Sequence, residues 1–516
     1  MPDFSVKFND FSGGWKGTLD SAKVAAGMYD ARNMIVYQDG SLGPRPGFKT
    51  FNLGRTTTGK INGVAHTGLA FGPSFVYRDN TTVYKVNDDN TGAGSASVGS
   101  VATTANNDIP EQFVVAGYQL LYLVRYPLAT ATALYQVDLF ANTVTAITAH
   151  PTSSLSGTIY GVRFVMTDQF GLTFWYSAAN DPTTWPAANF ITTGLKGGNI
   201  IFVSEQRNHL TVVTEDGQFY VLTGVPGVND ILRRVAEYLP RPSLLGPTSF
   251  VLTNNDLLWF LSPVNNFPAW FDGVQVQELQ YLSMNPEDPR ASYGSSGNPI
   301  AAANAIKAFV GSSPDAPAFV LPNTTNRLLT KHNGAWGLHL LGISVGRDWA
   351  SDGRGRMFAF APTQSAANTP VYVADWRLNR PAFTSDTHAQ PGDNSNTPLD
   401  SWVEFPEQWS DNSDLLRVDE VVVDFIRWNT GVANNEIDVL LTSMARGSER
   451  AETTKTKTWT QAGSSSTTAG VKDRVRFQFG DQGAGAGWKI KVTCKGVAIR
   501  AVYVNGTNVT GDGRVF

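Results

Sequence analysis

The side chains of this 516-residue sequence that could perform acid–base or metal chemistry are scattered, with no obvious clustering. Its six histidines include no pair at the spacing of metal ligands. The segment from Asn87 to Gly92 gathers oxygen ligands around a turn, but it lacks the regular spacing and the distal glutamate of an EF-hand. We therefore expect an acidic hairpin tip there, with no metal and no cofactor.

A glycosidase would need two carboxylates facing one cleft. Glu205, Glu215, Glu237 and Asp272 are candidates, but most of them fall in turns, where solvated side chains are expected. The sequence contains no P-loop, no Gly-x-Ser-x-Gly elbow and no His-Glu-x-x-His. Cys494 lies in an apolar run, which favours a buried, inert thiol. The chain is accordingly predicted not to be an enzyme.

The composition favours a β-rich globular protein. Hydrophobic residues make up 42% and charged residues only 16%, which supports a packed core. The 49 glycines and 27 prolines suit many short strands joined by tight turns. The net charge of −4 argues against a sequence-reading nucleic-acid binder, although DNA could slide through a mildly acidic channel.

No stretch approaches the roughly 20 apolar residues of a membrane span. The first residues alternate polar and apolar side chains and lack the apolar core of a signal peptide. We therefore expect the chain to fold in the cytoplasm of the cell that makes it.

Three regions are predicted, and the first of them, residues 1–55, has little that could form a core of its own. Residues 56–390 contain strand clusters that recur every 40–50 residues, with hairpin signals such as Asp216-Gly217 and Asp272-Gly273. That period predicts an irregular β-propeller of about six blades, with seven as the other option. Residues 391–516 alternate again and predict a C-terminal β-sandwich.

The first fifty residues carry the most distinctive pattern. It comprises Phe11-Ser12-Gly13-Gly14-Trp15, Ala31-Arg32-Asn33-Met34 and Gly40-Ser41-Leu42-Gly43-Pro44-Arg45-Pro46-Gly47-Phe48. This opening resembles that of phage tail nozzle proteins, also called tail tubular protein B, and of related packaged-DNA stabilisation proteins. Their pattern runs Gly-Gly, an Asn-containing segment, then Gly-Leu-x-x-Arg-Pro-Gly-Phe. Pro44 stands where that family often has a basic residue.

The resemblance implies a structural virion protein of a short-tailed phage. Such proteins form a ring, expected to be a homohexamer, that retains packaged DNA and forms the channel for its ejection. The implied partners are other copies of the chain, adaptor or portal-side connector proteins, tail fibres or spikes, DNA passing without sequence readout, and the host envelope. The implied location is the virion tail, assembled in the host cytoplasm.

Within that interpretation, residues 1–55 form an extended docking arm, and deleting residues 1–50 should abolish assembly before folding. Aromatic residues would anchor the arm and arginines would hydrogen-bond to the partner. The predicted docking residues are Phe8, Phe11, Gly13, Gly14, Trp15, Arg32, Asn33, Arg45, Pro46 and Phe48. The competing interpretation is that this segment closes the propeller by adding a strand to its last blade.

Two further functions stay open at this point. One is a distal minor tail or receptor-binding protein whose aromatic residues contact host glycans. The other is an envelope-degrading enzyme.

Overall fold

The computed structural model consists of β-strands, which confirms the all-β class. The structure describes residues 4–12, 30–58, 61–67, 74–102, 111–117, 119–125, 134–148, 154, 156–168, 171–194, 198–238, 250–252, 256–261, 268–278, 307–310, 317–320, 327–343, 349–352, 355–360, 370–410, 415–428, 434–444, 452–462, 470–480 and 484–509. Within these residues, no helix has the length and apolar character needed to cross a membrane.

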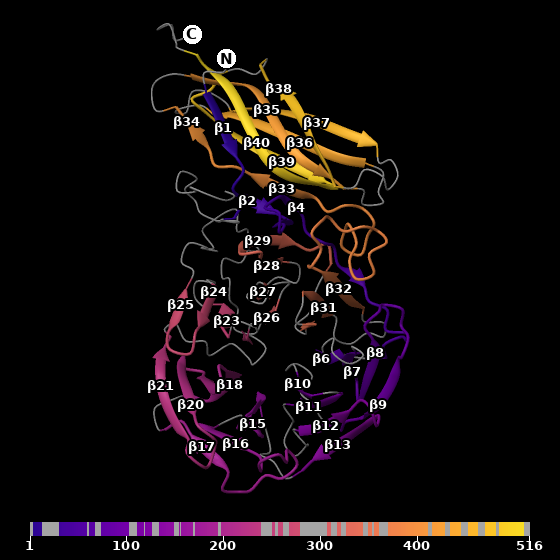
Figure 1. Cartoon of the computed structure of the whole chain (residues 1–516), viewed down its shortest axis with the longest axis vertical. Coiled ribbons are helices and arrows are strands. Elements are labelled where there is room, and N and C mark those ends of the chain that lie inside the picture. Colours follow the sequence, from indigo (N-terminus) through magenta and orange to yellow (C-terminus); the bar gives the residue numbers. More distant parts are fainter. Residues whose placement is uncertain are drawn as a thin grey trace.

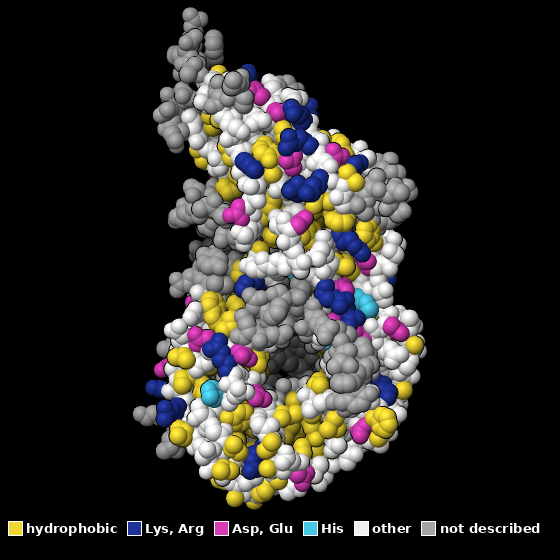
Figure 2. Space-filling model, in the orientation of Figure 1, with side chains coloured by type: hydrophobic (Ala, Val, Ile, Leu, Met, Phe, Trp, Pro, Cys, Tyr) yellow, Lys and Arg dark blue, Asp and Glu magenta, His cyan; other side chains and the backbone are white. Residues whose placement is uncertain are grey.

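Seven four-stranded antiparallel sheets, here called blades 1 to 7, are formed by the described residues and surround a central hollow (Figures 1 and 2). In six of the seven pairs of neighbouring blades, the first strands lie side by side around the ring. A β-propeller is thus confirmed, with one blade more than the six expected.

Blades 1 to 6 each take four strands in chain order. Blade 1 contains β6 (Ile61–His66), β7 (Ser74–Asp79), β8 (Thr82–Asn87) and β9 (Ala96–Ser100). Blade 2 contains β10 (Gln112–Gly117), β11 (Leu120–Val124), β12 (Leu134–Asp138) and β13 (Thr143–Ile147). Blade 3 contains β14 (Gly157–Tyr160), β15 (Arg163–Thr167), β16 (Thr173–Tyr176) and β17 (Phe190–Thr192). Blade 4 contains β18 (Ile200–Gln206), β19 (His209–Thr214), β20 (Gln218–Thr223) and β21 (Ile231–Glu237). Blade 5 contains β22 (Val251–Leu252), β23 (Leu258–Leu261), β24 (Pro268–Phe271) and β25 (Val276–Glu278). Blade 6 contains β26 (Lys307–Val310), β27 (Pro317–Val320), β28 (Arg327–His332) and β29 (Ala335–Leu340).

The second and third strands of several blades are apolar on both faces because each blade packs between two neighbours. β11 and β20 are buried along almost their whole length. The hairpin turns have the glycine conformation that the Asp-Gly pairs predicted. Gly217 ends the β19–β20 turn with φ +84°, and Gly273 lies in the β24–β25 turn with φ +96°. Both predicted Asp-Gly hairpins are confirmed.

Blade 7 is assembled from two distant parts of the chain. It contains β30 (Trp349–Ser351), β31 (Arg356–Phe360) and β32 (Val371–Asp375), and its fourth strand is β5 (Lys49–Thr50). β5 pairs with β32 through Lys49 opposite Val373 and Thr50 opposite Tyr372. The N-terminal segment therefore closes the propeller, as the competing interpretation predicted.

The C-terminal strands form the expected β-sandwich (Figure 1). One sheet contains β3 (Met34–Val36), β4 (Leu42–Pro44), β40 (Val497–Val509), β35 (Leu415–Arg427) and β38 (Val471–Gln478), with β1 (Phe4–Phe8) also paired to β40. The other contains β2 (Asp30–Arg32), β33 (Ser401–Glu404), β39 (Gly487–Lys495), β36 (Asn434–Met444) and β37 (Thr453–Ala462), with β34 (Gln408–Trp409) also paired to β39. Four strands from the first fifty residues thus belong to the sandwich.

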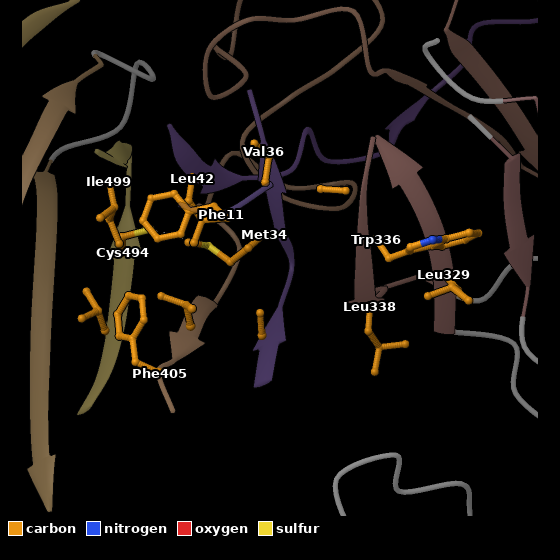
Figure 3. Packing of buried hydrophobic residues seen from close by; sticks show 14 of the residues in the cluster. Phe11, Met34, Val36, Leu42, Leu329, Trp336, Leu338, Phe405, Cys494 and Ile499 are labelled. Atoms are coloured by element: carbon orange, nitrogen blue, oxygen red, sulfur yellow. Dashed lines mark hydrogen bonds between the residues drawn. The ribbon is translucent and has the colours of Figure 1, made fainter. Parts of the chain in front are cut away.

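One apolar core runs from the sandwich through the N-terminal segment into the propeller. Figure 3 shows Phe11 and Met34 between Phe405 of the sandwich and Trp336 of blade 6, and all four side chains are buried in a single cluster. Cys494 belongs to the same cluster, and burial raises the pKa of its thiol to about 12. This agrees with the predicted inert thiol.

Candidate functional site

The N-terminal segment lies at the junction between the propeller and the sandwich. β2 pairs with β33, β4 pairs with β40, and β5 pairs with β32. Between β4 and β5 the chain crosses from one domain to the other. The described part of residues 1–55 therefore forms parts of both domains, which corrects the prediction of a separate docking arm.

A buried ion pair holds this crossing in place. Arg45 donates from its two terminal nitrogens to the two carboxylate oxygens of Asp393, at 2.8 and 2.6 Å. Both side chains are almost completely buried. Arg45 also donates to the carbonyl oxygens of Pro46 and Leu340. This two-bond geometry fixes the guanidinium plane as well as the charge.

Asp393 also accepts two backbone hydrogen bonds from the propeller side. The amide of Phe48 donates to one oxygen at 3.0 Å and that of Gly342 to the other at 2.6 Å. Burial alone would raise the pKa of Asp393, but the charge and hydrogen bonds of Arg45, with these amides, lower it below its ordinary value. The carboxylate is therefore held ionised among four donors.

Asn33 joins the same cluster from the sandwich side. Its side-chain oxygen accepts from the Leu340 amide at 2.9 Å and from Arg45 at 3.3 Å, while its side-chain nitrogen donates to the carbonyl of Asp400 at 3.0 Å. Asn33 has φ +56°, a conformation that asparagine tolerates better than most residues. Asn33, Arg45 and Asp393 are called the junction cluster below.

Close backbone packing explains the glycines around Arg45. A Cβ on Gly47 would lie 2.2 Å from the carbonyl oxygen of Gly392, and one on Gly43 would lie 2.7 Å from the ring of Tyr37. Phe48 is fully buried and meets Trp349 edge to face. The sequence from Gly43 to Phe48 is therefore dictated by packing inside this chain.

The other predicted docking residues also make contacts within the chain. Phe8 stacks on Phe405 with ring centroids 4.6 Å apart, and Phe11 is buried beside the same ring. The guanidinium of Arg32 lies 5.5 Å from the ring of Trp402. Pro46 is buried.

These contacts correct the docking prediction. Phe11, Arg45, Pro46 and Phe48 are buried within the chain, so they are not available to a partner. Gly13, Gly14 and Trp15 lie outside the described residues.

A second buried charge cluster joins blades 1 and 7. Asp88 faces His66 at 2.8 Å, and it pairs with Arg356 and with His388. Arg356 also bonds Asp352 at 2.8 Å. Burial opposes ionisation of Asp88, but the hydrogen bonds from His388 and His66 and the charge of Arg356 outweigh it and lower its pKa to about 2. Asp88 is therefore buried and paired, which corrects the expected acidic tip at this residue, whereas Asn87, Asp89 and Thr91 of the same turn are exposed.

The glycosidase candidates are not brought together as a set. Glu205 is the last residue but one of β18, at one end of blade 4, whereas Glu215 lies in the turn at the other end. Glu237 is half-exposed near Arg234 on the outermost strand of that blade. Asp272 accepts hydrogen bonds from the amides of its own turn.

Two carboxylates lie at the centres of these clusters: sequence reasoning missed Asp393, and it singled out the turn that contains Asp88 without finding its buried partners. Asp393 lies at the start of the region predicted as the β-sandwich, 348 positions from Arg45. The only local signal was Pro391-Gly392-Asp393-Asn394, which resembles many exposed turns.

Comparison with known proteins adds little to this geometry. No family model matches the chain, and no curated protein matches it. A solved structure described as "YCF48 bound to D1 peptide" is similar to 67% of this chain and 99% of its own, at 11% identity and a TM-score of 0.39. A likeness at that level carries no information about function.

Proposed function

We propose that this chain is a structural subunit of a phage virion, forming a ring in the tail or nozzle of a short-tailed phage. In this role it retains packaged DNA and forms the channel for its ejection. Its proposed partners are other copies of itself, an adaptor or portal-side connector, tail fibres or spikes, passing DNA and the host envelope. It would act in the virion tail after assembly in the host cytoplasm.

The observation that carries the proposal is the place of the family-like opening in this fold. Leu42 is fully buried, Arg45 forms the buried ion pair, Gly47 has no room for a side chain, and Phe48 is fully buried. These four positions, among those of the pattern Gly-Leu-x-x-Arg-Pro-Gly-Phe that this chain shares, each have a stereochemical requirement at the junction. Matched residues that are each required by packing support an architecture in common with that family more strongly than a chance match of residue types would.

The joined domains also suit a tail component. A ring that holds DNA must resist forces that would move its domains apart. A shared apolar core and a buried two-bond ion pair oppose such movement, because separation would expose both to water. The propeller and the sandwich are thereby suited to act as one rigid unit.

Cryo-electron microscopy of the phage that encodes this chain tests the proposal. We expect density for a seven-bladed propeller joined to a sandwich, repeated around the tail axis below the portal. Density for the chain in side fibres, with none on the axis, would refute the nozzle assignment. Removal of the gene should yield heads that lose their DNA.

A receptor-binding role is the second candidate, and one surface favours it. Trp402, Thr493, Asp438 and Thr458 occupy one cross-strand row on the outer face of the second sandwich sheet. Thr458 belongs to a column of exposed threonines on β37, Thr454, Thr456, Thr458 and Thr460. Hydroxyls beside an indole ring could contact sugars.

A glycan array probed with the purified protein tests this second role. Binding that Trp402→Ala abolishes, with Trp409→Ala as the control, would favour it over the nozzle assignment. No binding to any glycan would count against it.

A further inference from the structure

The outer face of the first sandwich sheet carries a concentration of positive charge that neither the fold nor the junction explains. The strands β38, β35, β40 and β1 lie side by side in this sheet. Residues of one parity, such as Val421, Val423 and Val502, are buried in the apolar core. The residues between them point to the opposite side, because successive side chains of a strand alternate between its two faces.

Cross-strand pairing places the cations of this outer side in adjacent rows. One row runs from Arg476 on β38 through Val422 on β35 and Tyr503 on β40 to Lys7 on β1. The next row on β38 begins at Arg474. The surface is called the basic face below, and its cations are Lys7, Lys472, Arg474, Arg476 and Arg500. Figure 2 shows lysine and arginine side chains over the sandwich, where Figure 1 places β1, β40 and β35.

Two carboxylates lie in the described part of these rows, and both are already neutralised. Asp424 accepts two bonds from the guanidinium of Arg474, at 2.5 and 2.8 Å, and this contact lowers the pKa of Asp424. Glu420 accepts from the side-chain amides of two neighbouring strands at 2.9 and 3.2 Å, and Arg476 lies 3.6 Å away. The chain as a whole carries a net charge of −4, so the excess of cations here is a local segregation of charge.

The cations of the basic face are accessible to a ligand. The side chains of Arg474 and Arg476 are 54% and 64% exposed. Lys7, Lys472 and Arg500 are exposed as well. These three form no ion pair with another residue that the structure describes. The face therefore has donors and charge to spare.

The surface between the cations is poor in apolar anchors. Val422 and Ile426 are only 6% and 5% exposed, and Val471 at the end of β38 is 39% exposed. Protein partners are usually held by apolar and aromatic anchors in desolvated pockets. Contact with a bilayer interface needs apolar side chains that insert into it. A polar, cationic sheet face suits a polyanion better than either of these partners.

We propose that the basic face binds the phosphate backbone of nucleic acid without reading its sequence. Lysine and arginine neutralise phosphates and release their counterions, which is the main source of sequence-independent affinity. Base edges are read by elements that enter a groove, and the face of a sheet does not enter one. The ring of Tyr503 lies 5.4 Å from the Lys7 ammonium and 5.6 Å from the Arg474 guanidinium, so it adds a stacking surface among the cations.

This contact deepens the proposed function, on which it rests for the presence of DNA beside the chain. Retention of packaged DNA requires a contact that holds the duplex, and release requires that this contact be weak. Phosphate pairing by a few exposed cations meets both needs, because each pair is screened by salt and several copies in a ring act together.

Fluorescence anisotropy with a labelled DNA duplex tests the proposal on the full-length protein. Two duplexes of unrelated sequence should bind equally. Their affinity should fall between about 50 and 200 mM salt with a logarithmic slope of about −3 to −4, as expected for some four phosphate contacts.

The triple variant Lys472→Gln, Arg476→Gln, Arg500→Gln should bind DNA at least about tenfold more weakly, with a slope shallower by about 2 to 3. Lys7→Gln, on a different strand, should lower the slope by about 1. The matched control, Arg207→Gln, Arg233→Gln, Arg234→Gln, removes the same charge from exposed positions of blade 4 and should bind like the original protein. Thermal melting checks that every variant is folded.

Equal weakening in the two triple variants would overturn the proposal, because net charge alone would then account for binding. Absence of binding at the lowest salt would also overturn it. So would tighter binding to phosphatidylglycerol vesicles than to DNA, or a basic-face variant that changes oligomeric state in light scattering, since the face would then contact lipid or a second copy. The place of the chain in the virion is measured separately. A chain on the tail axis that does not bind DNA refutes this inference and leaves the nozzle assignment standing.

Discussion

At the scale of single residues, Arg45 and Asp393 show how a buried charge can depend on a single counter-charge. Replacing Asp393 with asparagine leaves the guanidinium buried without its counter-charge. We expect this variant to lose about 3–5 kcal/mol of unfolding free energy, measured by urea denaturation.

The control for this prediction is Asp424→Asn, which breaks the exposed contact between Arg474 and Asp424. Exposed pairs of this kind contribute little, so its unfolding free energy should barely change. Equal losses in the two variants would show that the buried pair has no special role.

Two buried histidines predict a dependence of stability on pH. Burial lowers the pKa of His332 to about 4, and burial together with the charges of Arg45 and His332 lowers that of His339 well below its ordinary value. Both are neutral in the folded protein, whereas the unfolded chain takes up protons near pH 6.5. Their stabilising effect is therefore present above about pH 6.5 and is lost as pH falls from there towards about 4.

For His332 alone the loss at pH 5 is roughly 2 kcal/mol. Melting temperatures of the original protein and of His332→Asn, at pH 7 and pH 5, measure it. The variant should lose less stability between these two values of pH. Asp88 and Asp393, whose pKa values are lowered, add a further loss only below about pH 4. An identical pH dependence in both proteins would contradict the assignment to His332.

At the scale of elements, β5 is a two-residue strand that depends on the packing before it. Gly47→Ala would place a methyl group against the backbone of Gly392, which cannot yield as a flexible side chain could. We expect β5 to leave β32 and blade 7 to open, seen as faster cleavage by a protease. Gly480→Ala is the control, because its Cβ meets nothing closer than 3.9 Å. Resistance to cleavage equal to the control would mean that the crossing can shift.

The same element explains what the sequence could and could not predict. Alternating apolar runs and Asp-Gly turns predicted the hairpins correctly, because their cause lies within a few residues. The seventh blade was undercounted because its fourth strand comes from Lys49–Thr50, some 300 positions before the other three. The aromatic and arginine residues of the opening were recognised as important, but their partners inside the chain are too distant in sequence to be seen there.

This also changes the expected effect of deleting residues 1–50. The deletion removes β5 in full and core residues such as Phe11, Leu42 and Phe48. We now expect loss of folding together with any loss of assembly, in place of the assembly defect predicted from the sequence.

At the scale of the whole molecule, the shared core predicts that propeller and sandwich unfold together. A scanning calorimeter should record one transition whose calorimetric and van't Hoff enthalpies agree. Arg45→Ala removes the ion pair at the junction and should separate this into two transitions. Two transitions in the original protein would show that the domains are energetically independent.

The way in which the N-terminal segment closes the fold also sets an order of events during protein synthesis. β5 leaves the ribosome long before β32, because about 320 residues separate Thr50 from Val371. At a synthesis rate of about 5 to 20 residues per second, β5 waits roughly 15 to 65 seconds for its partner, and β1 waits longer still for β40. Blades 1 to 6 can form one after another on the growing chain, while the ring stays open. The nascent protein thus carries unpaired strand edges for most of its synthesis, and chaperones that shield such edges should raise its yield.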